Sequence, residues 1–197
     1  MFVVYGYGCD IYKKNQNRRR ANLNRYKNRI NNVEVLCNEK YSKSMTFDIW
    51  LRLLWGGKIL EPTAFVKEVI EKVCLALRQG DNVVLVGYSY GGSVAARVAM
   101  YLRLFCKELN IRNLKKNLHV VTFGSIFIPP PALTAGVDVK HYAFENDIAE
   151  YCHKVKNAPY LTRLQPRKLD PLSSHMDYDE YILDIARSGR LPDGTFV

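Results

Sequence analysis

The clearest pattern in the sequence is an apolar run, then a glycine-rich turn, then apolar positions three or four residues apart. The run from Val83 to Val86 is typical of a central parallel strand. After the turn, apolar residues recur with the spacing of a helix that packs on a sheet: Val94, Val98, Tyr101, Phe105 and Leu109. The segment therefore predicts a buried strand, a sharp turn and a helix, in that order.

Similar patterns recur on both sides of this segment. Short apolar runs predict five further strands, over residues 2–5, 33–36, 118–123, 139–144 and 160–165. Helical spacing and end signals predict a helix from about 61 to 80 and a last helix from about 177 to 187, and the tail after 190 is expected to be irregular. Because strands alternate with helices, we expect an α/β fold, a three-layer α/β/α sandwich with a mostly parallel sheet of about six strands.

One apolar stretch is compatible with more than one structure. Residues 45–60 are nearly continuously apolar, carry both tryptophans, Trp50 and Trp55, and include Gly56-Gly57. We interpret this stretch as a buried packing helix. The alternatives are a helix that covers a substrate site with a glycine hinge, or an element that lies at a membrane interface.

Length and composition fit one globular domain over residues 1–197. Hydrophobic residues make up 48% of the chain and charged residues 24%, which is ordinary for a protein with a core. We find no secretory signal and no apolar segment long enough to span a bilayer. The five cysteines are scattered without metal-ligand spacing, which favours reduced thiols and an intracellular, cytoplasmic location.

The net charge of +10 is unevenly distributed. Eight basic residues lie between Asp10 and Glu34 with no acidic residue among them: Lys13, Lys14, Arg18, Arg19, Arg20, Arg25, Lys27 and Arg29. A solvated basic loop is the simplest interpretation of segment 13–29. Peripheral contact with an anionic membrane comes second, and nucleic acid is the least favoured partner.

The glycine-rich turn reads Gly87-Tyr88-Ser89-Tyr90-Gly91, a Gly-x-Ser-x-Gly pattern between a strand and a helix. A serine lifted above the sheet edge in this way needs a sharp reversal, and glycines on both sides avoid a clash of strand with helix. The following helix would direct its N–H groups toward an oxyanion. The pattern therefore predicts a nucleophile elbow; the alternative is a glycine-rich turn that binds phosphate.

A serine nucleophile needs a base and a carboxylate that orients it, on connections after later strands. His175 lies between the last strand and the last helix and is our candidate base, with His153 as the alternative; His119 and His141 fall in strands. Asp147 directly follows a strand and is our candidate acid. Four weaker acid candidates are Asp138, Glu145, Glu150 and Asp170.

Two further features would complete such a site. The backbone N–H of Tyr90 is one expected oxyanion donor, and the N–H of Tyr7 in the turn Gly6-Tyr7-Gly8 is the second, unless that turn has no such role. The apolar, proline-rich loop 125–131 leaves the end of a strand and is either a wall for an acyl chain or a surface loop.

These residues resemble the class 3, fungal-type lipases of the α/β-hydrolase fold. The family's elbow commonly reads Gly-His-Ser-Leu-Gly-Gly-Ala, and a Thr-Phe-Gly-Ser/Ala-Pro strand end, an Asn-Asp-x-Val acid segment and a late histidine follow it. Here these correspond to residues 87–93, 122–125, 146–148 and His175. The chain departs from the pattern at Tyr88, where the family has histidine, and at Ile126, where it has proline; it is also short for the family.

The resemblance implies a minimal α/β-hydrolase that cleaves carboxylic esters, with lipid or small esters as substrates. Ser89, Asp147 and His175 would form the triad through an acyl-enzyme, with no metal and no organic cofactor. Two alternatives remain open at this point. One is acyl transfer through the same acyl-enzyme, and the other is a non-catalytic module that binds an anionic membrane or nucleic acid through segment 13–29.

Overall fold

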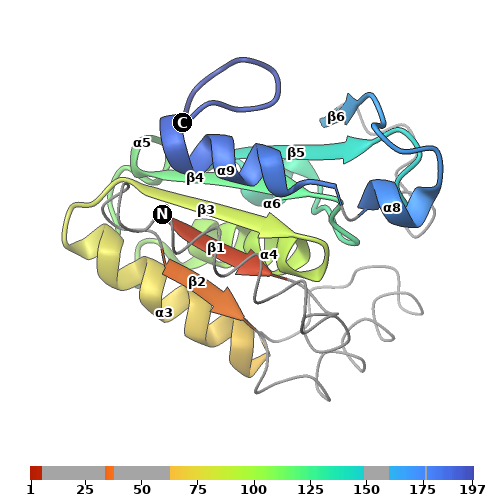
Figure 1. The fold of residues 1–197 in the computed structure, drawn as a ribbon. Coiled ribbons are helices and arrows are strands. Elements are labelled where there is room, and N and C mark those ends of the chain that lie inside the picture. Colours follow the sequence, from red (N-terminus) through yellow and green to blue (C-terminus); the bar gives the residue numbers. More distant parts are fainter. Residues whose placement is uncertain (6–33, 38–62, 149–159, 176) are drawn as a thin grey trace.

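The computed structural model describes residues 1–5, 34–37, 63–148, 160–175 and 177–197 (Figure 1). Within them the chain has an α/β fold built on an all-parallel sheet, so the expected α/β class is confirmed. Segment 13–29 and the tryptophan-bearing stretch 45–60 lie outside the described residues.

The sheet has the strand order β2-β1-β3-β4-β5-β6. Its strands are β1 (Phe2–Tyr5), β2 (Glu34–Cys37), β3 (Val83–Tyr88), β4 (Leu118–Phe123), β5 (Asp138–Phe144) and β6 (Leu161–Leu164). Strands added after β1 first extend the sheet in one direction, to β2, and then in the other, from β3 onward. In open α/β sheets, sites form at the carboxyl ends of the strands near such a reversal of order.

Helices cover both faces of the sheet (Figure 1). On one face, α3 (Ala64–Arg78) and α4 (Tyr90–Phe105) share a core with Val4, Leu85 and Val120. On the other face, α9 (Asp179–Ser188) shares a core with Val3, Val86 and Val121. Neighbouring strand residues point to opposite faces, so strands buried on both sides need the continuous apolar runs seen in the sequence.

Most expected elements form close to their expected bounds, with informative differences. The β3 strand continues through Gly87 and Tyr88, so the chain reverses at Ser89 itself. Residues 34–36 of the expected second strand lie in β2, and α3 begins after the N-cap Thr63, whose hydroxyl accepts a hydrogen bond from the Val66 N–H. Three short helices were not expected from the sequence: α5 (Leu114–Asn117), α6 (Pro131–Thr134) and α8 (Pro171–His175).

The tail after residue 190 is more ordered than the sequence indicated. Arg190 and Phe196 form an antiparallel bridge, and Asp193 accepts hydrogen bonds at the turn between them from Thr195. The Tyr142 hydroxyl also donates to Asp193, over 3.0 Å, and Lys140 donates to Thr195. These bonds fasten the tail to β5.

Candidate active site

Ser89 occupies a strained turn between β3 and α4. Its φ of 57° and ψ of −125° lie outside the regions that residues other than glycine normally adopt. The Ser89 N–H donates to the carbonyl of Phe123 over 2.8 Å, which joins the turn to the end of β4. Its carbonyl accepts from the Gly92 N–H over 3.0 Å, which opens the helix. The sequence predicted this reversal of the chain. The two backbone hydrogen bonds of Ser89 stabilise its strained conformation.

Two glycines allow the close approach of strand, helix and neighbouring loop. A Cβ on Gly87 would lie 2.3 Å from the carbonyl oxygen of Gly91, so a side chain there would overlap the first turn of α4. This is the crowding that the Gly-x-Ser-x-Gly spacing implied. A Cβ on Gly92 would lie 2.9 Å from the Cβ of Ser125, a close approach that the sequence analysis did not identify.

The expected oxyanion donors can be placed only in part. Tyr90 is the first residue of α4, so its backbone N–H lies next to Ser89 at the positive end of the helix dipole. Its side chain is buried in the core beneath. Tyr7, the other expected donor, lies outside the described residues, although β1 ends beside β3 and pairs Tyr5 with Tyr88.

Asp147 is fully buried just beyond the carboxyl end of β5. Its backbone N–H donates to the Phe144 carbonyl over 2.9 Å, which turns the chain sharply after the strand. Its carboxylate accepts a hydrogen bond from the hydroxyl of Tyr178, with 2.5 Å between the Tyr178 oxygen and Asp147 Oδ2. The same hydroxyl accepts from the Phe144 N–H over 2.8 Å. A buried carboxyl group requires such hydrogen-bond partners.

Tyr178 also belongs to the site, although the sequence offers no local signal for it at the start of the last expected helix. Burial, and then the negative charge of Asp147, raise the pKa of the Tyr178 phenol far above its usual value. The phenol therefore stays protonated and keeps its proton available to Asp147. Its ring packs against Phe144 and Phe123, with centroid distances of 4.5 and 5.4 Å.

His175 is the last residue of α8, on the connection that follows β6. Helix α8 is tied to the loop after β5, so the base candidate and Asp147 lie on neighbouring connections at the carboxyl edge of the sheet. Ser89 lies at the same edge, because β3, β4 and β5 are parallel and in register near their ends. The structure thus brings the backbones of the three expected residues to one edge of the sheet.

Two of the other histidines, His119 and His141, lie in strands and contact polar side chains of a neighbouring strand. His119 lies near the start of β4, and its Nδ1 is 2.8 Å from Asp138 Oδ2 at the start of β5, the edge opposite Ser89. His141 is buried within β5, with Nδ1 2.7 Å from the hydroxyl oxygen of Thr122. His153, the alternative base, lies outside the described residues.

The weaker acid candidates also have other roles where they can be placed. Asp138 is the partner of His119 at the opposite edge. Glu145 is exposed and accepts from Gln165 over 3.0 Å, and Asp170 accepts from the Ser173 N–H over 2.9 Å in the first turn of α8. Glu150 lies outside the described residues. Asp147 is therefore the described candidate acid with both full burial and a place at the correct edge.

The loop 125–131 is more closely packed than a surface loop. Ser125 is buried, lies 3.3 Å from the hydroxyl of Ser93 in α4, and donates to the Phe127 carbonyl over 2.6 Å. Ile128 is 6% exposed and packs with Ala143 and Leu161. The Ile128 side chain thus belongs to a small core cluster rather than to an exposed face.

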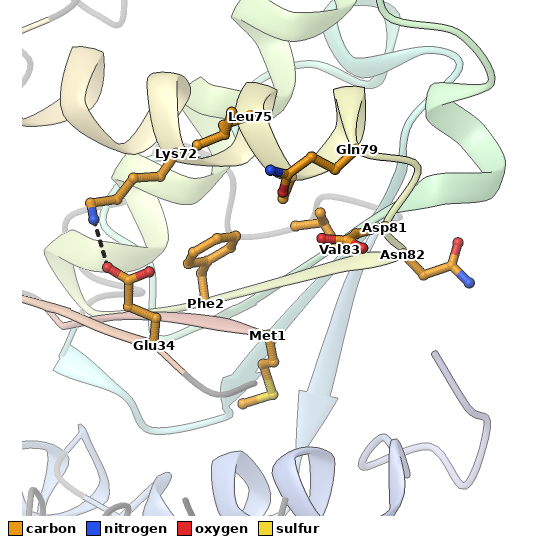
Figure 2. A pocket seen from close by; sticks show the side chains of 10 residues that line it. Met1, Phe2, Glu34, Lys72, Leu75, Gln79, Asp81, Asn82 and Val83 are labelled. Carbon is orange, nitrogen blue, oxygen red and sulfur yellow. Dashed lines mark hydrogen bonds and ion pairs between the residues drawn. The ribbon is translucent and has the colours of Figure 1, made fainter. Parts of the chain in front are cut away.

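A large hollow lies away from this edge. Figure 2 shows it between α3 and the amino ends of β1, β2 and β3, lined by Phe2, Leu75 and Val83 and crossed by the ion pair between Lys72 and Glu34. Its volume is about 870 Å³. Because it opens at the opposite end of the strands from Ser89, it does not contribute to the candidate active site.

No protein-family model, curated protein or solved structure matches the chain. In the part of the chain that the structure describes, no helix is both long and apolar enough to cross a membrane. Among the same residues, no three His, Cys, Asp or Glu side chains lie together as a metal ion would require. The geometry around Ser89 and Asp147 is therefore the main indication of what the protein does.

Proposed function

We propose that the protein is a serine hydrolase of the α/β-hydrolase fold that cleaves carboxylic esters, with lipid esters as the preferred class. The observation that carries the proposal is the strained backbone of Ser89 at the carboxyl end of β3, on the sheet edge that also holds buried Asp147. Strain of about 1–3 kcal/mol persists where the surrounding structure enforces it, and it gathers at functional sites. The lipid preference rests on the resemblance to class 3 lipases.

The order of the parts supports the same reading. Ser89 follows β3, Asp147 follows β5 and His175 follows β6, which is the serine, acid, histidine order of this type of hydrolase. A phosphate-binding turn would explain the helix N-terminus, but it would not explain a buried carboxylate two strands away at the same edge. The strained serine and the buried acid together favour acyl chemistry.

In the proposed reaction, His175 removes the hydroxyl proton of Ser89 as the oxygen attacks the ester carbonyl. The Tyr90 N–H, at the positive end of α4, stabilises the oxyanion. The bond to the leaving alcohol breaks, and His175 gives its proton to that alcohol. Water, activated by His175, then releases the acid from Ser89. Asp147 orients His175 and stabilises its positive charge throughout.

A fluorophosphonate probe tests this proposal, because it reacts covalently with an activated serine. We expect wild type to be labelled, and Ser89→Ala and His175→Ala to be unlabelled. His119→Ala is the matched control, since His119 is half-buried at the opposite edge and its loss should leave labelling intact. Labelling that requires His153 but not His175 would replace the proposed base, and folded wild type that does not react would reject the hydrolase assignment.

Hydrolysis rates for a series of p-nitrophenyl esters then test the substrate class. A preference for lipid esters predicts that kcat/KM rises with acyl chain length. A maximum at acetate or propionate would contradict the lipid preference while leaving the serine hydrolase assignment in place.

A further inference from the structure

One backbone carbonyl joins the two connections that carry the proposed acid and base. The Lys168 oxygen accepts a hydrogen bond from the side-chain amide of Asn146 over 2.9 Å and another from the hydroxyl of Ser174 over 2.9 Å. Asn146 directly precedes Asp147, and Ser174 directly precedes His175. The residues that precede the proposed acid and base are therefore linked by two hydrogen bonds that share one acceptor, the Lys168 oxygen.

We propose that Asn146 and Ser174 are positioning residues that fix Asp147 and His175 relative to each other through the Lys168 carbonyl. The inference rests on the proposed function, because it assigns the two residues a role in that triad. This role requires no contact between either side chain and the substrate. We name the three linked groups, the Asn146 amide, the Lys168 carbonyl and the Ser174 hydroxyl, the carbonyl brace.

Further hydrogen bonds hold Asn146 and Ser174 of the carbonyl brace in position. Ser174 is fully buried, and its backbone N–H also donates to the Asp170 carbonyl over 3.0 Å. The amide of Asn146 donates a further hydrogen bond to the Leu169 carbonyl over 3.1 Å. Its own Oδ1 is buried and accepts no hydrogen bond from the described residues. Among the described residues, the Asn146 side chain therefore makes its hydrogen bonds through its NH2 group, to the carbonyls of residues 168 and 169.

Helix α8 needs such support. It has five residues, far fewer than a helix requires to be stable alone, so contacts with the rest of the protein must set its position. A triad must be held to within about 0.5 Å, and a displacement of about 1 Å can cost a factor of about 100 in rate. Groups that hold the last residue of α8 against the loop after β5 therefore bear directly on catalysis.

The same two connections offer a matched control. Gln165 donates to Glu145 over 3.0 Å and so also links the chain after β6 to the chain after β5. Both side chains are exposed, and the bond does not involve a residue next to Asp147 or His175. If any cross-link between the connections were enough, Gln165→Ala would have the same effect as a change in the brace.

The experiment measures kcat and KM for a soluble ester in Asn146→Ala, Ser174→Ala, the double variant and Gln165→Ala. We expect each single brace variant to lower kcat about tenfold and to leave KM within about twofold, because orientation and not binding is lost. Both bonds end on one oxygen, so the double variant should resemble the worse single variant instead of losing about 100-fold. Ser174→Thr, which keeps the hydroxyl, should stay close to wild type, as should Gln165→Ala.

Hydrogen exchange at the Ser174 backbone N–H gives a readout that does not need activity. We expect Asn146→Ala to accelerate this exchange at least about tenfold and Gln165→Ala to leave it unchanged. Folded brace variants with kcat within twofold of wild type, or equal losses in Gln165→Ala, would overturn the proposal. Faster exchange in a protein whose wild type reacts with no ester or probe would show instead that the proposed function had failed, leaving the brace a structural link only.

Discussion

The hydroxyl oxygen of Tyr178 lies 2.5 Å from Oδ2 of Asp147. The same oxygen also accepts a hydrogen bond from the Phe144 N–H. One buried oxygen therefore bonds both a backbone donor and a carboxylate. Removing that oxygen takes one hydrogen bond from each of these two buried groups, and each such loss costs about 1–3 kcal/mol.

We therefore expect Tyr178→Phe to lower the free energy of unfolding by about 3 kcal/mol, as measured by urea denaturation. Tyr181→Phe is the control on the same helix, because it removes a hydroxyl near the exposed guanidinium of Arg167 and keeps the ring that lies against that group. An exposed contact of this kind contributes at most about 1 kcal/mol. Equal losses in the two variants would show that the buried oxygen has no special role.

The positive φ of Ser89 predicts a trade between stability and reactivity. Glycine adopts such a backbone with little strain, so Ser89→Gly should stabilise the protein by about 1 kcal/mol, or about 2–4 °C in Tm, while it abolishes probe labelling. Ser89→Ala removes the same hydroxyl and keeps the strain, so it should show no comparable gain. Thermal unfolding of the two variants side by side tests the difference.

The close contact at Gly87 predicts a strong effect of a single methyl group. In Gly87→Ala the new Cβ would meet the backbone of Gly91 and Gly92, which cannot rotate away, so we expect a loss of at least about 3 kcal/mol or a failure to fold. Gly80→Ala is the control. It has open space around it and only an unfavourable φ of 87°, so it should lose about 1 kcal/mol. Soluble yield and urea midpoints distinguish the two.

Asp193 predicts how the tail responds to acid. Partial burial alone would raise the pKa of its carboxyl, but hydrogen bonds from Thr195 and Tyr142 and the charge of Lys140 outweigh this and lower the pKa to about 2. A lowered pKa contributes stability above the ordinary aspartate value, and that stability is lost as the pH falls toward 2.

Asp193→Asn should therefore be less stable than wild type at pH 7, and the difference should shrink between about pH 4 and pH 2. Guanidinium denaturation at a series of pH values measures it. Asp184→Asn is the control, because the exposed Asp184 carboxyl makes a surface contact, at 3.9 Å, with Arg187. A difference between wild type and Asp193→Asn that stayed constant with pH would contradict this account of Asp193.

The sequence predicts those parts of the site that depend on near neighbours in the chain. The reversal at Ser89 and the need for glycine at 87 follow from sterics within five residues. Tyr178 could not be assigned in this way, because its role depends on where the start of α9 meets the end of β5. The close approach of Gly92 to Ser125 depends on how α4 packs beside β4, which no local pattern encodes.

Short elements were missed for a related reason. Helix α8 has one turn's worth of residues and begins with Pro171, so it offers no periodic pattern to detect. Ile128 shows the same limit, since an apolar residue in a proline-rich loop can pack inward only when β5 and β6 are there to receive it.

The pairing of β1 with β3 has a consequence for how the chain can change in length. Phe2 lies opposite Leu85, so segments far apart in sequence meet at the centre of the sheet. The connection between these two strands contains β2 and α3, which both pack on the sheet, so a residue inserted within either element would move its buried side chains out of place. The turn at Ser89 is constrained in the same way, because β3 ends at Tyr88 and α4 begins at Tyr90.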